Sequence, residues 1–146
     1  GGRLHRNFMG YTEVRTTSLL GLGVSAISET PDCYHQNEKV IGEWERRIDA
    51  GGIPTLRGHR LSDDDRKRRA LITSLMTRFE ARIDDPAITL HEPALRELEA
   101  DGIVAIHDGW LTVPESGRAF LRNVAAVLDA YLPAQDLSQP AYSKSV

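Results

Sequence analysis

Side chains that could do chemistry on their own are few and scattered in this sequence. The single cysteine is Cys33, so no internal disulfide is possible. The histidines show no metal-ligand spacing, and no two of them lie three or four residues apart on one predicted helix. They are His5, His35, His59, His91 and His107. The sequence therefore predicts no catalytic residue and no metal site in this chain.

The strongest candidate for ligand contact is the backbone segment Gly21–Ser28. It belongs to residues 19–28, Leu-Leu-Gly-Leu-Gly-Val-Ser-Ala-Ile-Ser, a run that is continuously apolar rather than alternating. This pattern predicts a strand buried on both faces, as in a parallel sheet. Gly23 would let the backbone come close to a ligand. No later run has the same character, so we expect the partner sheet to lie outside this chain.

The residues that follow predict two helices joined by an extended segment. Asn37 is the expected N-cap of a helix that ends near Ala50, with Gly51 as its stop. Residues 53–61 are short and extended. Ser62 and Asp65 form a near capping box at the start of the second helix. An apolar stripe at helical spacing faces the predicted core; it comprises Leu71, Ile72, Leu75, Met76, Phe79 and Ile83.

The last third of the chain predicts a short helix, a hairpin and a final helix. Thr89 and Glu92 make a second capping box for the short helix, which runs to Gly102. Two β-prone runs around Asp108-Gly109 predict a type I′ hairpin. Pro114 then opens a helix whose inward residues are Phe120, Leu121, Val124, Leu128, Tyr131 and Leu132. This order of elements is typical of a winged-helix-like domain.

Composition and charge exclude several classes of protein. Hydrophobic residues make up 40% and charged residues 27%, which is ordinary for a globular domain. The net charge of −3 lacks the basic excess typical of proteins that bind nucleic acid or anionic membranes. No apolar run approaches the ~20 residues that span a bilayer. We therefore predict no nucleic-acid partner, no membrane partner and, from the single cysteine, a reducing cytoplasm.

Residues 66–69, Arg-Lys-Arg-Arg, form one basic cluster. Such a cluster makes DNA binding an alternative function. Asp63, Asp64 and Asp65 precede the cluster, so acid–base pairing within the helix explains it without nucleic acid. The predicted recognition helix, residues 93–101, carries three acidic residues against one arginine, and phosphate would repel it. A stand-alone winged-helix DNA-binding module stays open as an alternative.

A set of short runs, spread in order over nearly the whole chain, carries a family resemblance. The runs are Arg6-Asn7-Phe8-Met9-Gly10-Tyr11-Thr12, residues 19–28, Cys33-Tyr34-x-Gln36-Asn37, Arg57-Gly58, Leu61, Asp64-Asp65, Arg68-Arg69, Ser74-Leu75, Asp101-Gly102, Thr112, Gly117-Arg118 and Arg122-Asn123. They resemble the C-terminal portion of oxygen-independent coproporphyrinogen III oxidases, the coproporphyrinogen dehydrogenases of the radical SAM family. Radical-SAM haem chaperones share a Leu-Gly-x-Gly segment, but the first run and Gln36-Asn37 favour the oxidase.

The resemblance implies an oxidoreductase of porphyrin and haem biosynthesis that uses a 4Fe–4S iron–sulfur cluster and S-adenosyl-L-methionine. A 5′-deoxyadenosyl radical takes hydrogen from a propionate of coproporphyrinogen III, and loss of carbon dioxide leaves a vinyl group. Two propionates react in this way, giving protoporphyrinogen IX. The cluster-binding cysteines of the family have no counterpart here, since Cys33 matches a non-ligand position. We therefore expect this chain alone to be inactive, to bind neither cofactor, and to need the N-terminal radical-SAM barrel of the same protein.

The resemblance also implies where the cofactor is contacted. The position that matches Ile27 touches S-adenosylmethionine in the family, and Ala26 and Gly23 are the other candidate cofactor-binding residues of the segment. Met9 departs from the glutamine that the family often has, so no site is built on it.

These observations predict an α+β chain in four parts. Residues 1–35 are expected to be the last strand and exit loop of a radical-SAM α/β barrel. Residues 36–61 are a connecting helix and strand, and residues 62–132 are a mostly helical, winged-helix-like C-terminal domain with a short β-hairpin. Residues 133–146 are a loosely held tail. The chain begins with Gly1 rather than Met, which fits the expected truncation.

Overall fold

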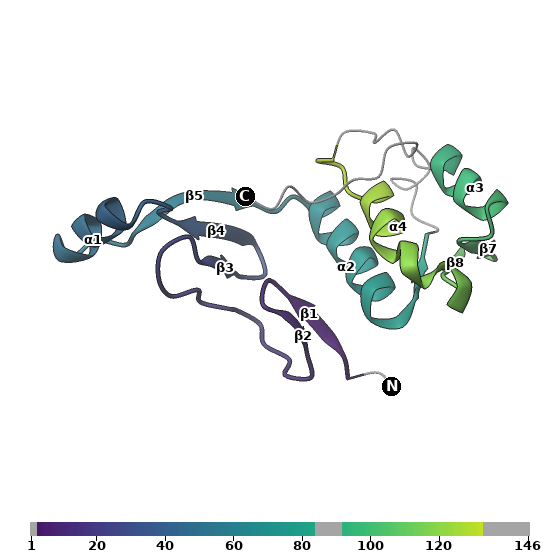
Figure 1. Ribbon diagram of the computed structural model, residues 1–146, viewed down its shortest axis with the longest axis horizontal. Coiled ribbons are helices and arrows are strands. Elements are labelled where there is room, and N and C mark those ends of the chain that lie inside the picture. The colour runs from purple at the N-terminus through teal and green to yellow at the C-terminus, as the bar shows by residue number, and fades with distance from the viewer. Residues whose placement is uncertain (1–2, 84–91, 133–146) are drawn as a thin grey trace. The chain divides into compact units, whose positions relative to one another are not determined.

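The computed structural model describes residues 3–83 and 92–132. The chain divides into two compact units, Gly1–Thr73 and Ser74–Val146 (Figure 1). Both units combine helices with small antiparallel sheets, so the predicted α+β class is confirmed. None of the described helices is long and apolar enough to cross a membrane.

The first unit is built on two small sheets. Strands β1 (His5–Asn7) and β2 (Gly10–Thr12) form a hairpin that the sequence did not predict. Strands β3 (Ile27–Glu29), β4 (Cys33–Asn37) and β5 (Thr55–Arg60) form an antiparallel sheet with β4 in the centre (Figure 1). Helix α1 (Ile41–Asp49) lies between β4 and β5 in the sequence. The extended segment predicted for residues 53–61 is therefore confirmed as β5.

The strand predicted for residues 19–28 is wrong in most of its length. Only Ile27 onward is a strand, and it pairs antiparallel with β4 rather than within a parallel sheet. Leu20 and Leu22 are 73% and 85% exposed, so the segment is not buried on both faces in this chain. The physical reason is a turn: Gly23 and Ser25 have φ of 97° and 61°, which breaks extended backbone just before β3.

The predicted cap of the first helix is also wrong. Helix α1 begins at Ile41, and its N-cap residue Val40 makes no side-chain capping bond. Asn37 is instead the last residue of β4, and its buried side chain bonds to a neighbouring loop. The predicted stop is confirmed, because Gly51 has φ of 73° and its N–H bonds to the carbonyl of Ile48.

Helix α2 (Asp63–Arg78) starts with the predicted capping box. The Ser62 N–H and hydroxyl donate to Asp65 Oδ2 at 2.8 and 2.7 Å, and the Asp65 N–H donates to Ser62 Oγ at 3.1 Å. The helix ends earlier than the predicted stripe, because Phe79 has φ of 64° and the chain continues as a strand. Phe79 and Ile83 therefore do not belong to the helix.

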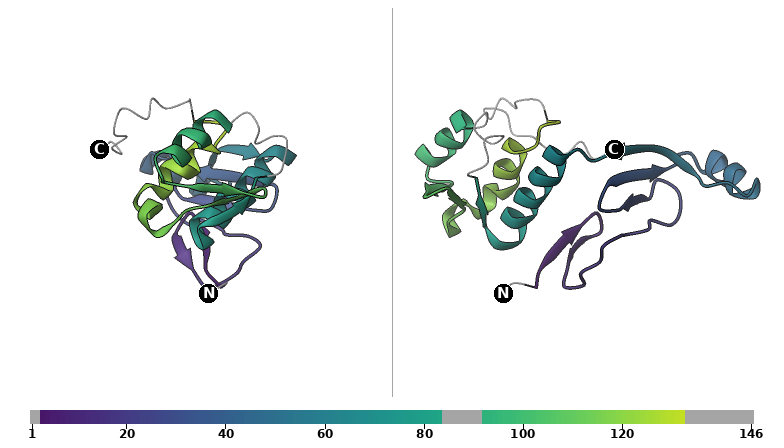
Figure 2. Two further views of the ribbon diagram at one scale, coloured as in Figure 1. Left: turned by 90° about the vertical axis from the view of Figure 1, so that its right-hand side faces the viewer. Right: turned by 180° about the vertical axis from the view of Figure 1, so that it is seen from behind.

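The second unit holds most of the apolar core. Strands β6 (Glu80–Arg82), β8 (Trp110–Thr112) and β7 (Ala105–His107) form an antiparallel sheet in that order. Helices α3 (Glu92–Ala100) and α4 (Leu121–Val127) contact each other (Figure 2). Among the described residues, the buried apolar side chains of this unit are Leu75, Met76, Ala81, Leu95, Leu98, Val104, Leu111, Val113, Leu121, Val124, Ala125 and Leu128.

The hairpin of the second unit forms as predicted. Asp108 and Gly109 have φ of 49° and 76°, the pair of positive values that a type I′ turn requires. Glu99 of α3 fixes the hairpin to the helix, because its Oε1 accepts the Ile106 N–H at 2.9 Å. An ion pair with Arg96 and this bond lower the pKa of Glu99.

The end of the chain differs in part from the prediction. Pro114 is followed by a 3₁₀ helix, η2 (Glu115–Phe120), before α4. Leu121, Val124 and Leu128 are buried as predicted. Phe120, Tyr131 and Leu132 were predicted to face inward but are 44–67% exposed, because they lie outside the short helix that faces the core. The predicted capping box at Thr89 and the tail 133–146 lie outside the described residues.

Candidate functional site

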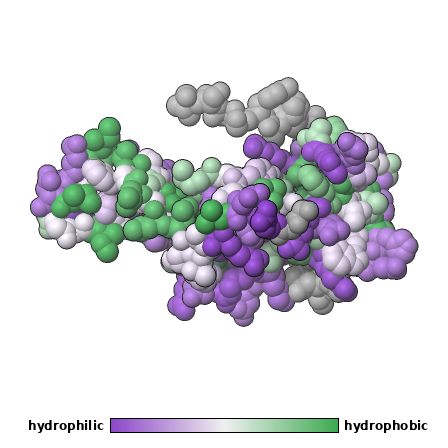
Figure 3. All heavy atoms as spheres, turned by 90° about the horizontal axis from the view of Figure 1, so that it is seen from below, coloured by the Kyte–Doolittle hydropathy of each residue, from purple (hydrophilic) through white to green (hydrophobic). Residues whose placement is uncertain are grey.

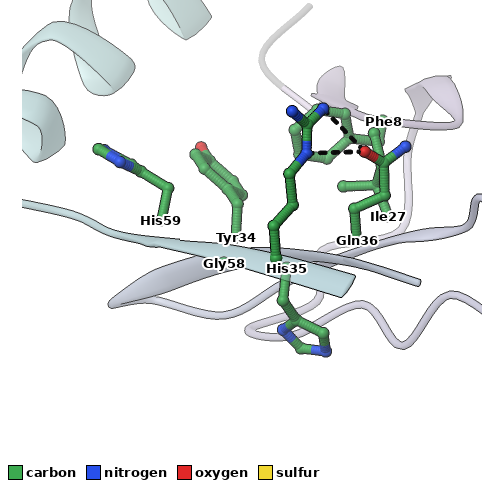
Figure 4. Close-up of a pocket in the computed structure, with 8 residues that line it drawn as sticks. Phe8, Ile27, Tyr34, His35, Gln36, Gly58 and His59 are labelled. Carbon is green, nitrogen blue, oxygen red and sulfur yellow. Dashed lines mark hydrogen bonds between the residues drawn. The ribbon is translucent and has the colours of Figure 1, made fainter. Parts of the chain in front are cut away.

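One face of the β3-β4-β5 sheet carries a pocket of about 290 Å³ (Figure 4). Its walls combine aromatic, apolar and basic side chains. The residues that line it are Phe8, Ile27, Tyr34, His35, Gln36, Arg57, Gly58 and His59. All of them belong to the first unit.

Strand pairing explains why these side chains gather. Gln36 of β4 lies between Ile27 of β3 and Arg57 of β5 in the sheet register. Side chains directly opposite each other on paired strands point to the same face. Tyr34 is paired with His59 in the same way, two residues along. His35, between Tyr34 and Gln36, points to the opposite side of the sheet (Figure 4).

The β1–β2 hairpin supplies the aromatic edge of the pocket. The Phe8 ring packs edge-on against the Tyr34 ring, with the ring centroids 5.1 Å apart. The guanidinium of Arg69, from α2, lies 5.2 Å from the centre of the Tyr34 ring and also pairs with Glu29. Burial, and then the nearby charge of Asp65, raise the pKa of Tyr34, so the phenol stays protonated at neutral pH.

The polar side of the pocket is a chain of hydrogen bonds. Nε and Nη2 of Arg57 donate to Gln36 Oε1 at 3.1 and 2.9 Å. The amide nitrogen of Gln36 in turn donates to the Ser25 carbonyl at 3.1 Å. The Gln36 amide is thereby held at both ends, and the Arg57 guanidinium is oriented by it.

A loop beside the pocket contains the segment singled out from the sequence. The buried Asn37 amide donates to the carbonyls of Gly21 and Gly23 at 3.3 and 2.9 Å, and the Asn37 N–H donates to the Ala26 carbonyl at 2.9 Å. The Gly21 N–H donates to Ser28 Oγ at 3.0 Å. These bonds fix the shape of the loop that leads into Ile27.

The predicted cofactor contacts fall at different places. Ile27 lines the pocket. Ala26 and Gly23 are half-buried residues of the adjoining loop and do not line the pocket. Sequence reasoning missed the contribution of Asn37 and the pairing of Gln36 with Arg57.

The single cysteine has the environment of a small packed side chain, as expected. Cys33 is half-buried, and its Sγ lies 3.2 Å from Thr30 Oγ1. In the part of the chain that the structure describes, no group of three or more His, Cys, Asp or Glu side chains is placed to hold a metal ion. A 4Fe–4S cluster takes several thiolates, so one cysteine does not fit that group.

The basic cluster on α2 is paired with acidic residues, as predicted. Arg66 forms an ion pair with Asp63, and Arg68 Nε donates to Asp64 Oδ2 at 2.6 Å. Arg66 also lies 3.5 Å from Asp32. These pairs account for Arg66 and Arg68 without a phosphate ligand.

The fold and the sequence together indicate the class of protein. A solved structure of coproporphyrinogen III oxidase from Escherichia coli, described as a radical SAM enzyme, matches this chain with a TM-score of 0.79 and 37% identity. The match covers 90% of this chain and 32% of that protein. The chain is therefore similar to one part of a radical SAM enzyme. No protein-family model matches the chain.

Three curated relatives carry the same name. The oxygen-independent coproporphyrinogen III oxidase of Pseudomonas aeruginosa is 34% identical over 99% of this chain and 33% of its own length. The enzyme of the same name from Escherichia coli K12 is 39% identical over 90% and 31%, and that of Thermostichus vulcanus is 36% identical over 99% and 47%. The predicted resemblance is confirmed, and the chain spans 31–47% of the length of these relatives.

Proposed function

We propose that this chain is the C-terminal part of an oxygen-independent coproporphyrinogen III oxidase. The whole enzyme oxidatively decarboxylates two propionates of coproporphyrinogen III to vinyl groups, which yields protoporphyrinogen IX for haem biosynthesis. The observation that carries the proposal is the similarity over 90–99% of the chain to enzymes of this name, together with the TM-score of 0.79. We also propose that residues 62–132 form a winged-helix-like cap, because the described elements follow one another in the order α2, β6, α3, β7, β8.

The proposed partner is the radical-SAM barrel formed by the rest of the enzyme. Among the described residues of the first unit, the buried apolar side chains are Pro54 and Leu61, which is a small core. Leu22 and Ile53 are 85% and 80% exposed, and apolar residues are interspersed with polar ones on the end of this unit that carries α1 (Figure 3). Exposed apolar surface of this kind favours burial against another protein surface. In this proposal that surface belongs to the barrel.

The proposed cofactors are S-adenosyl-L-methionine and a 4Fe–4S cluster, which supply the 5′-deoxyadenosyl radical when bound. The cluster belongs to the barrel in this proposal, because the single cysteine does not fit it. S-adenosylmethionine fits better, since Ile27 presents an apolar side chain in a pocket with aromatic walls. Gly23 and Ala26 serve this contact by shaping the loop that leads into Ile27.

The proposal predicts anaerobic turnover of coproporphyrinogen III by the full-length protein that contains this chain. With S-adenosylmethionine and a reductant, we expect protoporphyrinogen IX and two molecules of carbon dioxide per substrate. The 146-residue chain alone is the control and is expected to release none. A full-length protein that binds haem and leaves coproporphyrinogen unchanged contradicts the oxidase and supports the haem-chaperone alternative.

A further inference from the structure

Arg57 lines the pocket, and its positive charge pairs with no acidic side chain among the described residues. Within the described residues, none of the ion pairs involves Arg57, although its guanidinium is held in a defined orientation. We infer that Arg57 binds a carboxylate of the molecule that occupies this pocket. The inference rests on the proposed function, and it identifies Arg57 as a residue that recognises a ligand of the proposed enzyme.

The orientation of the guanidinium leaves donors for such a ligand. An arginine side chain carries five N–H donors, and the Gln36 carbonyl oxygen accepts from Nε and from Nη2. Both hydrogens of Nη1 and the second hydrogen of Nη2 are left for an anion. Since the Gln36 amide is neutral, it fixes the guanidinium without cancelling its charge. Arginine binds carboxylates with two parallel hydrogen bonds when it is oriented in this way.

The acidic residues of this face are engaged elsewhere. Glu29 pairs with Arg69. Asp65 accepts from Ser62 and lies 3.4 Å from the Nε2 of His59. The positive charge of Arg57 is therefore not neutralised by the sheet or by α2, and an anion that enters the pocket meets it at an exposed position.

The rest of the pocket indicates what kind of carboxylate fits. Phe8, Ile27 and Tyr34 give it apolar and aromatic walls beside the guanidinium. A volume of about 290 Å³ suits one carboxylate-bearing arm with the apolar group that carries it, rather than a whole tetrapyrrole. Two ligands of the proposed enzyme offer this chemistry: a propionate arm of coproporphyrinogen III, and the amino-acid carboxylate of S-adenosylmethionine.

The test compares Arg57→Met with Arg60→Met in the full-length protein, after turnover by the wild type has been established. Arg60 lies on the same strand, is exposed, and alternates to the opposite face of the sheet, so it is a control of equal charge. Binding of coproporphyrin III, of its tetramethyl ester and of S-adenosylmethionine is measured for each variant. Losing a charged hydrogen-bonded pair is expected to weaken binding by about tenfold to a hundredfold.

The result that supports the inference is a loss confined to Arg57→Met and to one carboxylate ligand. Weaker binding of coproporphyrin III, with the ester unchanged, assigns the site to a propionate; weaker binding of S-adenosylmethionine alone assigns it to the methionyl carboxylate. Unchanged binding of both acids, equal losses in both variants, or an equal loss for the ester would overturn the inference. If the wild type shows no turnover, the proposed function fails instead.

A second variant keeps arginine in place and adds an internal carboxylate. Gln36→Glu puts a negative charge on the atom that accepts from Arg57, so the guanidinium is neutralised within the protein. The change also removes the N–H that donates to the Ser25 carbonyl. Gln36→Met, which loses the same donor without adding a charge, is therefore the control, and the loss of binding is expected to be larger in Gln36→Glu. We expect the same loss of ligand binding as in Arg57→Met, with an unchanged circular dichroism spectrum. Binding equal to that of the wild type in Gln36→Glu would also overturn the inference.

Discussion

Replacing Asn37 by aspartate is expected to reduce turnover by the full-length protein sharply and to lower the stability of the first unit by about 2–4 kcal/mol. Asparagine donates two hydrogen bonds from its amide, to the carbonyls of Gly21 and Gly23. An ionised aspartate has no hydrogen to donate and would face both oxygens from a site that is only 6% exposed. The loop that leads into Ile27 therefore loses its support.

The matched control for this prediction is Asn7→Asp. The side-chain oxygen of Asn7 accepts the Met9 N–H at 2.9 Å, and aspartate keeps that acceptor, so the same chemical change is harmless there. Hydrogen exchange at residues 19–26 and the KM for S-adenosylmethionine are the measurements. Fast exchange and a raised KM in residual activity are expected for Asn37→Asp alone. Unchanged exchange and KM would show that Asn37 does not position this loop.

Gly117→Ala is expected to destabilise the second unit by about 3 kcal/mol or more. A Cβ at this buried position collides with the carbonyl oxygen of Ile103 and lies 2.9 Å from its carbonyl carbon. Backbone atoms have less freedom to move aside than the end of a side chain, so η2 or the start of the hairpin must shift. Urea unfolding followed by the fluorescence of Trp110 measures the loss.

Gly102→Ala is the control that measures the cost of backbone strain without a collision. Gly102 has φ of 70°, but no atom lies within 4 Å of the Cβ that alanine would add. A cost of about 1 kcal/mol is expected there, from the left-handed backbone alone. If Gly117→Ala costs no more than Gly102→Ala, the close packing of η2 against Ile103 is contradicted.

Features that depend on near neighbours could be predicted from the sequence. Asp108 and Gly109 are adjacent residues that tolerate positive φ, and they form the expected turn. Ser62 and Asp65 lie three apart, the spacing that lets each bond to the other across the first helical turn. In both places the local chemistry and the surrounding fold favour the same conformation.

The segment 19–28 could not be predicted because its composition and its local conformation point to different structures. The apolar run indicates burial, yet Leu22 is 85% exposed in this chain. The serine side chain at position 25 does not predict the φ of 61° found there. A hydrogen bond from the Ser25 N–H to the Glu38 carbonyl stabilises this conformation. That bond joins residues thirteen positions apart, and residue patterns along the chain do not reveal it.

Only part of the candidate site could be predicted from the sequence, for the same reason. Ile27 was identified through the family resemblance, and it does line the pocket. Gln36 and Arg57 are 21 residues apart and meet only through the register of β4 and β5. Both residues belong to runs that carried the resemblance, which was the one available signal. The contact between their side chains could be identified only from the pairing of the strands.

The central claim is that this chain is one part of a larger iron–sulfur enzyme. The most direct test is the intact mass of the source gene's product together with its iron and sulfide content. We predict a product about three times the mass of this 16.2 kDa chain, because the chain spans 33% of one relative. It should hold about four irons and four sulfides. A product near 16.2 kDa without iron would contradict the account.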